Sequence, residues 1–285
     1  MFANLLIGLR EGLEASLIVG ILIAYVVKVD RRDVIARIWA GVAAAIIVSI
    51  ALGFALTEFA QAMGPAAEPV IAGVASILAA AMVTWMIFWM AKTARSIKGA
   101  LESEVATSLS KGAWAVVGIA FLAVVREGAE TTLFVWAAAQ NADATIRPLA
   151  GAVVGILIAA ALGYLIYRGS LKFNLSAFFL WSGVFLIIIA ASMLVGGIGD
   201  LQEEAGLLPF LTGTAYDFSH AIPENSILFI VLRGIFGFHN SMTWLQLLVW
   251  IAFVAITMTT FLRKSVRRKI TPVETTEIRI IRSVN

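Results

Sequence analysis

Seven apolar stretches follow one another along the chain, and short polar connections separate most of them. They cover about residues 4–27, 36–57, 69–91, 112–139, 148–167, 175–198 and 241–262. A transmembrane α-helix needs about 20 consecutive, predominantly apolar residues, and each stretch is long enough. The pattern therefore predicts an all-α polytopic membrane protein with seven transmembrane helices in one transmembrane domain, residues 1–270.

The connection between the sixth and seventh stretches is longer than the others and covers residues 199–240. It mixes polar residues with the apolar run ILFIVLRGIFGF at 227–238. This run is short for a span and contains Arg233. We therefore expect a re-entrant or interfacial segment in this outer segment, with an eighth span as the alternative.

The composition supports a membrane protein and excludes several classes of function. The chain is 61% hydrophobic and 14% charged, with a mean hydropathy of +0.95, whereas soluble domains carry about 25% charged residues. Because it has no cysteine, disulfides, thiolate metal sites and thiol catalysis are excluded. No zinc-protease, serine-hydrolase or nucleotide-binding motif stands in a suitable context. We expect neither an enzyme nor a bound cofactor.

Basic residues gather on alternate connections, whereas the other connections are mainly acidic. They follow the first stretch (Lys28, Arg31, Arg32, Arg37), the third (Lys92, Arg95, Lys98, Lys111), the fifth (Arg168, Lys172) and the seventh (Arg263, Lys264, Arg267, Arg268, Lys269). The positive-inside rule then places the N-terminus outside and the tail 271–285 in the cytoplasm. These charges indicate a multi-pass protein of the cell membrane rather than a nucleic-acid surface.

Two copies of one charged motif lie inside predicted spans. REGLE occupies residues 10–14 in the first span, and REGAE occupies 126–130 in the fourth. The span after each motif carries small residues at every fourth position: Gly41, Ala45, Ser49 and Gly53, then Gly151, Gly155, Ala159 and Gly163. Small residues let membrane helices pack closely. The pattern predicts two repeats, about 1–95 and 110–198, of inverted orientation, followed by the seventh helix at 241–262.

The motif residues form a candidate cation site within the membrane. Measured from the basic residues that end the two spans, all four glutamates lie about 21–28 Å outward at 1.5 Å per residue. Glu11, Glu14, Glu127 and Glu130 would bind the ion. Arg10 and Arg126 would balance and orient these glutamates, which leaves a formal charge of −2. Such a cluster can take up protons, or bind hard cations such as ferric iron, Mn²⁺, Mg²⁺ or Ca²⁺.

Two other interpretations of polar residues stay open. The motifs could be buried ion pairs that fasten the first and fourth spans together, although buried pairs contribute little stability. In the outer segment, Glu203, Glu204, Asp217 and His220 form a candidate capture site for a cation, and the alternative is a solvated polar loop.

The paired motifs resemble the high-affinity iron permease family, the oxidase-linked iron transporters of eukaryotes and their bacterial relatives. The second copy has Ala129 where the first has Leu13, and both are apolar. The resemblance implies that iron is the transported substrate and that the four motif glutamates bind it. It also implies a partner outside the membrane, either a ferroxidase or another iron-handling protein.

Other functions remain as alternatives to iron import. A transporter of another divalent cation, Mn²⁺ or Pb²⁺, would use the same architecture. An intramembrane enzyme with paired acids would show turnover without ion movement. The sequence leaves open the oxidation state of the iron, the driving force and the oligomeric state.

Overall fold

The computed structural model describes residues 2–64, 67–93, 107, 112–140, 146–169, 175–222, 226, 229, 232 and 237–267. The long helices are α1 (Phe2–Lys28), α2 (Ile35–Ala62), α3 (Glu68–Thr93), α5 (Ala113–Gln140), α6 (Ile146–Tyr167), α7 (Leu175–Gly199) and α9 (Trp244–Arg267). Each coincides with one predicted span to within a few residues. Pro69 and Pro148 lie in the first turns of α3 and α6, where proline breaks no helical hydrogen bond.

Five of these helices, α2, α3, α6, α7 and α9, are long and apolar enough to cross a membrane. The other two, α1 and α5, are equally long, but each carries three charged residues near its middle. The structure thus confirms a mainly helical polytopic membrane protein. The count of seven spans and their orientation stay predictions.

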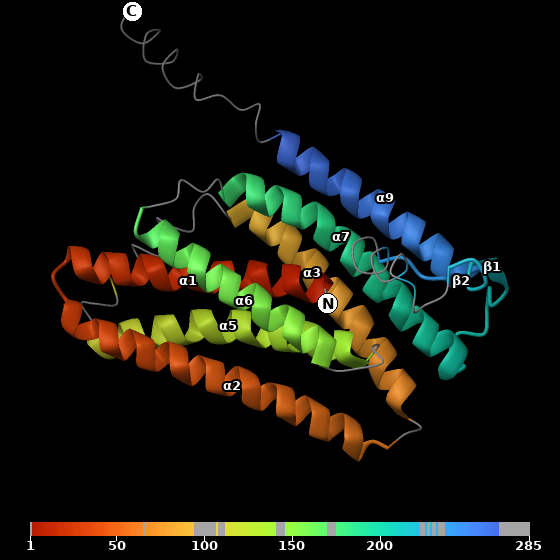
Figure 1. Ribbon diagram of the computed structural model, residues 1–285, viewed down its shortest axis with the longest axis horizontal. Helices are drawn as coiled ribbons and strands as arrows, with labels where there is room; N and C mark the ends of the chain where they lie inside the picture. Colours follow the sequence, from red (N-terminus) through yellow and green to blue (C-terminus); the bar gives the residue numbers. More distant parts are fainter. Residues whose placement is uncertain are drawn as a thin grey trace, which may run out of the picture.

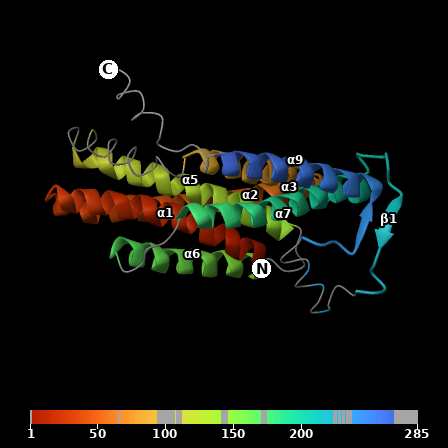
Figure 2. The same cartoon turned by 90° about the horizontal axis from the view of Figure 1, so that it is seen from above.

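The helices form two groups (Figure 1). In the first group, α1 packs most extensively on α6, α2 packs on α5, and α1 also contacts α5. Viewed from above, α1 lies between α5 and α6 (Figure 2). In the second group, α7 packs on both α3 and α9. Both groups contain helices from each predicted repeat.

Close approach at two helix crossings depends on glycine. A Cβ at Gly12 of α1 would lie 2.8 Å from the Cβ of Ala159 on α6, and a Cβ at Gly128 of α5 would lie 3.0 Å from the Cβ of Ser49 on α2. Since real Cβ atoms rarely come this close, only glycine permits these crossings.

A hydroxyl reinforces each of these crossings. The Ser16 hydroxyl lies 3.4 Å from the carbonyl oxygen of Ala159 and 3.1 Å from that of Leu13 in its own helix, so its hydrogen is shared between the two. The Thr132 hydroxyl is likewise shared between the carbonyl oxygen of Ser49 at 3.1 Å and that of Gly128 at 2.8 Å. Ser16 and Thr132 follow their motifs at the same interval. The crossing of α1 with α6 and that of α5 with α2 are therefore built from corresponding residues.

Two apolar clusters lie on opposite sides of the charged motifs. The first joins Ile7 of α1 and Phe134 and Ala137 of α5 to residues of α3, α7 and α9. The second joins the later half of α1 to the earlier halves of α2 and α5, for example Leu22, Ile38 and Val116. Because early residues of α1 meet late residues of α5, these two helices are antiparallel.

The outer segment contains structure that the apolar pattern did not predict. A π-helical turn, η3 (Asp200–Glu204), extends α7, and strands β1 (Thr214–Asp217) and β2 (Ser241–Thr243) pair antiparallel. The helix α9 begins at Trp244, three residues later than predicted, because residues 241–243 form β2. The strands lie at the opposite end of the molecule from the turn that joins α1 to α2 (Figure 1).

Buried amides fasten this segment to the helices. Gln202 accepts a hydrogen bond from the Thr243 hydroxyl at 2.7 Å, and Gln246 accepts one from the backbone N–H of Thr243 at 2.7 Å. Gln246 also donates to the carbonyl oxygen of Val195 at 3.4 Å. Most of the run 227–238 and the whole tail 271–285 lie outside the described residues. The re-entrant or interfacial segment and the cytoplasmic tail therefore stay predictions.

Candidate functional site

The first motif lies in the interior of α1 and is almost fully buried. The side chain of Arg10 is 2% exposed, and its Nε lies 3.3 Å from Oε1 of Glu14, one helical turn further along. Glu11 is buried as well, and neither of its carboxylate oxygens has a hydrogen-bond partner among the described residues. A charged group without a partner in a dry interior is costly, so this carboxylate is a candidate ligand.

The second motif lies on α5 and repeats the local geometry in a more open environment. Nε of Arg126 lies 3.1 Å from Oε1 of Glu130 and 4.0 Å from Oε1 of Glu127. Both glutamates are buried, whereas the side chain of Arg126 is 40% exposed. The indole of Trp89, on α3, lies over the guanidinium, 4.5 Å from ring centroid to Cζ.

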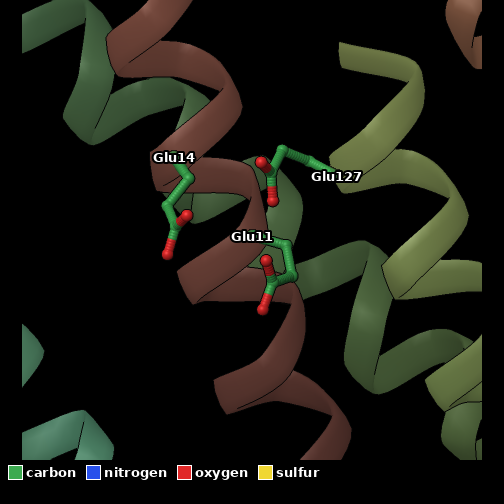
Figure 3. A group of neighbouring side chains, drawn as sticks. All are labelled: Glu11, Glu14 and Glu127. Atoms are coloured by element: carbon green, nitrogen blue, oxygen red, sulfur yellow. The ribbon is translucent and has the colours of Figure 1, made fainter. Parts of the chain in front are cut away.

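Three of the four motif glutamates converge. Glu11, Glu14 and Glu127 each offer a carboxylate oxygen, and these oxygens lie within 4.8 Å of one another. Figure 3 shows Glu127 reaching from α5 toward α1, where it meets the two carboxylates of that helix. Within the described part of the chain, this is the one group of three or more acidic or histidine side chains placed to hold a metal ion.

Glu130, the fourth predicted ligand, lies outside this three-oxygen group and is paired with Arg126. Three of the four glutamates thus converge on one point, and the fourth forms an ion pair with Arg126. Helical spacing alone does not separate these arrangements, because the distinction depends on how α1 and α5 face each other.

The four residues of the candidate capture site are all exposed. Glu203 and Glu204 lie on η3, whereas Asp217 ends β1 and His220 lies in the turn that follows. Hydrogen bonds from Ser219, by its hydroxyl first and then by its backbone N–H, hold the pKa of Asp217 below its usual value. Among the described residues these four do not gather into one metal-binding group.

Two residues near the site were missed in the sequence. Asn4 is buried on α1, and its Nδ2 has no hydrogen-bond partner among the described residues. It precedes Glu11 by two helical turns and so lies on nearly the same face. A polar residue in an apolar span, two turns from the motif, could have been recognised in the sequence as part of the site. Trp89 could not be found from the sequence, because its contact with Arg126 depends on tertiary packing.

Comparison with known proteins identifies the family. The sequence profile of the iron permease FTR1 family matches residues 1–270. The protein belongs to that family. The family match therefore spans the seven long helices of the described residues, both motifs and the outer segment.

Curated relatives cover most of the chain. A ferrous iron permease EfeU of Escherichia coli O6:H1 (strain CFT073) is 35% identical over 264 residues, 92% of this chain and 95% of its own length. One of Shigella sonnei (strain Ss046) shows the same identity and coverage. One of Yersinia pestis is 32% identical over 257 residues, 89% of this chain and 90% of its own. No solved structure matches the chain.

The donor set suits a divalent cation. Carboxylate oxygens are hard ligands, and metal–oxygen bonds of about 2.0–2.2 Å span ligand oxygens up to about 4.4 Å apart. Small rotations of Glu11, Glu14 and Glu127 would therefore bring their oxygens onto one ion. Counting both motifs, four carboxylates face two guanidiniums, and the formal charge of −2 would be neutralised by one divalent cation.

Proposed function

We propose that this protein is a permease of the cell membrane that imports ferrous iron through the glutamate group of α1 and α5. One observation carries the proposal: three buried carboxylates converge between two long helices of a chain that belongs to an iron permease family. The preference for ferrous iron is supported by the relatives, which are named ferrous iron permeases.

In this proposal Glu11, Glu14 and Glu127 bind the ion together, and Glu130 takes part when Arg126 releases it. Each arginine lies one turn from a glutamate of its own helix, so the arginine compensates negative charge while no ion is bound. When a cation arrives, it replaces the arginine as the counter-charge. Such a site can release its ion, because the arginine can re-form its ion pair with the carboxylate.

The topology proposed here has seven spans, with the N-terminus outside and the C-terminus in the cytoplasm. Helices of 27 and 28 residues at 1.5 Å per residue are about 40 Å long, so α1 and α5 are long enough to span. The distribution of basic residues supports the orientation. A reporter fused after residue 285 should be cytoplasmic; an external reporter would refute this topology.

The two repeats of this proposal are α1–α3 and α5–α7. Exchanging them maps the pairing of α1 with α6 onto that of α5 with α2, and leaves α3 paired with α7. The corresponding hydrogen bonds of Ser16 and Thr132 support the same exchange. Together with the antiparallel motif helices, this favours transport by alternating access between inverted repeats.

We also propose that the outer segment receives iron from a partner outside the membrane, either a ferroxidase or another iron-handling protein. The exposed acids Glu203, Glu204 and Asp217, with His220 beside them, support a weak capture surface rather than a buried site. Replacing these four residues together should raise the iron concentration needed for half-maximal uptake. An unchanged value would remove the capture surface from the proposal.

Uptake by the purified protein in sealed vesicles tests the function directly. Radioactive ferrous iron should accumulate above the level of empty vesicles, and a pH gradient should show whether protons are coupled to the movement. Glu11→Gln and Glu127→Gln should each abolish uptake. The matched control is Glu58→Gln, which neutralises an exposed carboxylate at the end of α2 and should leave uptake unchanged.

The same assay separates the alternatives. Accumulation of Mn²⁺ or Pb²⁺ with no accumulation of iron would show that another divalent cation is the substrate. If the motif only fastens helices together, Glu11→Gln and Glu127→Gln should unfold more easily in detergent. Variants that fold normally but fail to transport would exclude this structural role.

A further inference from the structure

The repeated motif allows residues on the two sides of the glutamate group to be compared one by one. The counterpart of a residue on α1 is the α5 residue at the same distance from its own motif. Because α1 and α5 are antiparallel, the two members of such a pair lie on opposite sides of the glutamate group. By helical spacing, four such pairs lie on the motif face of the two helices. They are Ile7 with Ala123, Arg10 with Arg126, Ile18 with Phe134, and Ile21 with Ala137.

On the side where α1 begins, every member of these pairs is buried. Ile7, Phe134 and Ala137 are at most 1% exposed and belong to the apolar cluster that includes Val83 of α3 and Leu186 of α7. Arg10 is equally buried behind them. On this side the motif helices are therefore packed against the group formed by α3, α7 and α9.

On the side where α5 begins, the counterparts in these four pairs are less buried, whereas Ala120, the counterpart of Asn4, is buried in the second apolar cluster. Ala123, Ile18 and Ile21 are only half-buried, and the side chain of Arg126 is 40% exposed against 2% for Arg10. A guanidinium exposed to hydrocarbon is costly, so arginines within membranes face water or protein. The exposed part of Arg126 therefore indicates a water-filled recess on this side, with Trp89 of α3 at its wall.

We propose that the structure is the state closed on the Arg10 side and open on the Arg126 side, that Phe134 is the plug, and that Trp89 positions Arg126 in the open state. The opposite state exchanges the members of each pair: Phe134 and Ile7 leave the α3–α7 surface, and Ile18 and Ala123 take their place. The inference rests on the proposed function for two points: alternating access between the inverted repeats, and the assignment of the open side to the cytoplasm.

Single cysteines test the proposal cleanly, because the chain has none of its own. Ala123→Cys reports the open side and Ala137→Cys the closed side, and both replace alanine on the motif face of α5. A membrane-impermeant maleimide is applied to inside-out and right-side-out vesicles without iron. Leu122→Cys is the control for exposure to lipid, since Leu122 is 65% exposed on the outward face of the same helix.

Ala123→Cys should react in inside-out vesicles at least about tenfold faster than Ala137→Cys reacts in either orientation, as expected if the opposite state is at most about 10% populated. Adding Phe134→Ala should expose Ala137→Cys from the outside and slow Ala123→Cys. The proposal is overturned if Ala137→Cys reacts from the outside as fast as Ala123→Cys does from the inside, or if Ala123→Cys reacts no faster than Leu122→Cys.

Trp89 is tested with the same reporters. Trp89→Leu removes the ring above Arg126. It should lower the ratio of the labelling rate of Ala123→Cys to that of Ala137→Cys by between about twofold and about thirtyfold, the range of a cation–π contact. Trp89→Phe should restore part of the ratio. Trp85→Leu, on the exposed face of α3, should not change it; equal shifts in Trp85→Leu and Trp89→Leu would refute the positioning role.

The labelling experiment and the uptake experiment test different proposals, and either proposal can fail without the other. A normal labelling asymmetry without iron uptake would overturn the proposed substrate and leave the two states standing. Iron uptake with no asymmetry would overturn the two states and leave the substrate standing. Reaction of Ala123→Cys only in right-side-out vesicles would overturn the cytoplasmic assignment of the open side.

Discussion

Gly128→Ala should destabilise the protein by closing the space that lets α5 cross α2. The added Cβ would lie 3.0 Å from the Cβ of Ser49 and closer still to its Oγ. The Cβ cannot move without shifting α2, and rotating the Oγ away would break its hydrogen bond to the carbonyl oxygen of Ala45. Overpacking of this kind costs about 1–3 kcal/mol. Separating the helices would also lose the hydrogen bond from Thr132 to the carbonyl oxygen of Ser49, worth about 0.6 kcal/mol in a membrane. We expect a loss of about 2–4 kcal/mol in all.

The assay is unfolding in mixed micelles, followed by the loss of helical circular dichroism as denaturing detergent is added. Ser49→Gly removes both opposing atoms, so Gly128→Ala with Ser49→Gly should recover most of the stability lost by Gly128→Ala, with a coupling energy of about 1–3 kcal/mol. The control is Gly118→Ala on the same helix, where a Cβ would meet nothing within 4 Å; it should stabilise by about 0.5–1 kcal/mol. A single variant as stable as wild type, or a double variant no more stable than Gly128→Ala, would refute the reasoning.

Three further predictions use the same preparations. Thr132→Val, which keeps the shape but loses the donor to the Ser49 carbonyl, should lower the unfolding free energy by about 0.6 kcal/mol; no change would show that the bond contributes nothing. Asn4→Leu removes a buried amide without a partner for its Nδ2 among the described residues, and should raise the unfolding free energy by about 1–3 kcal/mol; a loss of stability would contradict this. Because Ser219 lowers the pKa of Asp217, that carboxylate stabilises its turn above the usual aspartate pKa of about 3.9. The contribution is lost as the pH falls through the lower folded value. The protection factor of the Ser219 amide, its exchange rate relative to the intrinsic rate at the same pH, should therefore fall on acidification in wild type and stay constant over that window in Asp217→Asn.

The long helices could be predicted because one property determines them. An apolar stretch of about 20 residues has few alternatives to a helix in a membrane, where every backbone group must be paired internally. The prolines of the described helices fall in first turns, as with Pro69 and Pro148, so no predicted span is interrupted. The motif glutamates were found for a related reason, since charged residues inside such stretches stand out against the apolar background.

The arrangement of the site could be predicted only in part. Periodicity places Glu11 and Glu14 on one face of α1, but the choice of Glu127 rather than Glu130 as their neighbour depends on the crossing of α1 and α5. Strands β1 and β2 are three to four residues long, too short to produce a recognisable alternation. The π-helical turn η3 depends on contacts with α3, which local sequence does not encode.

The two motifs are nearly identical in sequence and yet differ in exposure, so residues outside the motifs favour one state. The parts without a counterpart are α9 and the outer segment. Phe261 of α9 fits against Gly183 of α7, where a Cβ would lie 2.7 Å from the ring, and Gln246 donates to the carbonyl oxygen of Val195. These contacts brace α7, against which α3 packs, and give the motif helices a fixed surface to move against. An exact inverted repeat would make the two states equal in energy. A seventh helix that packs more extensively on α7 than on α3 removes that equality, and the side it favours is the side on which Arg126 is exposed.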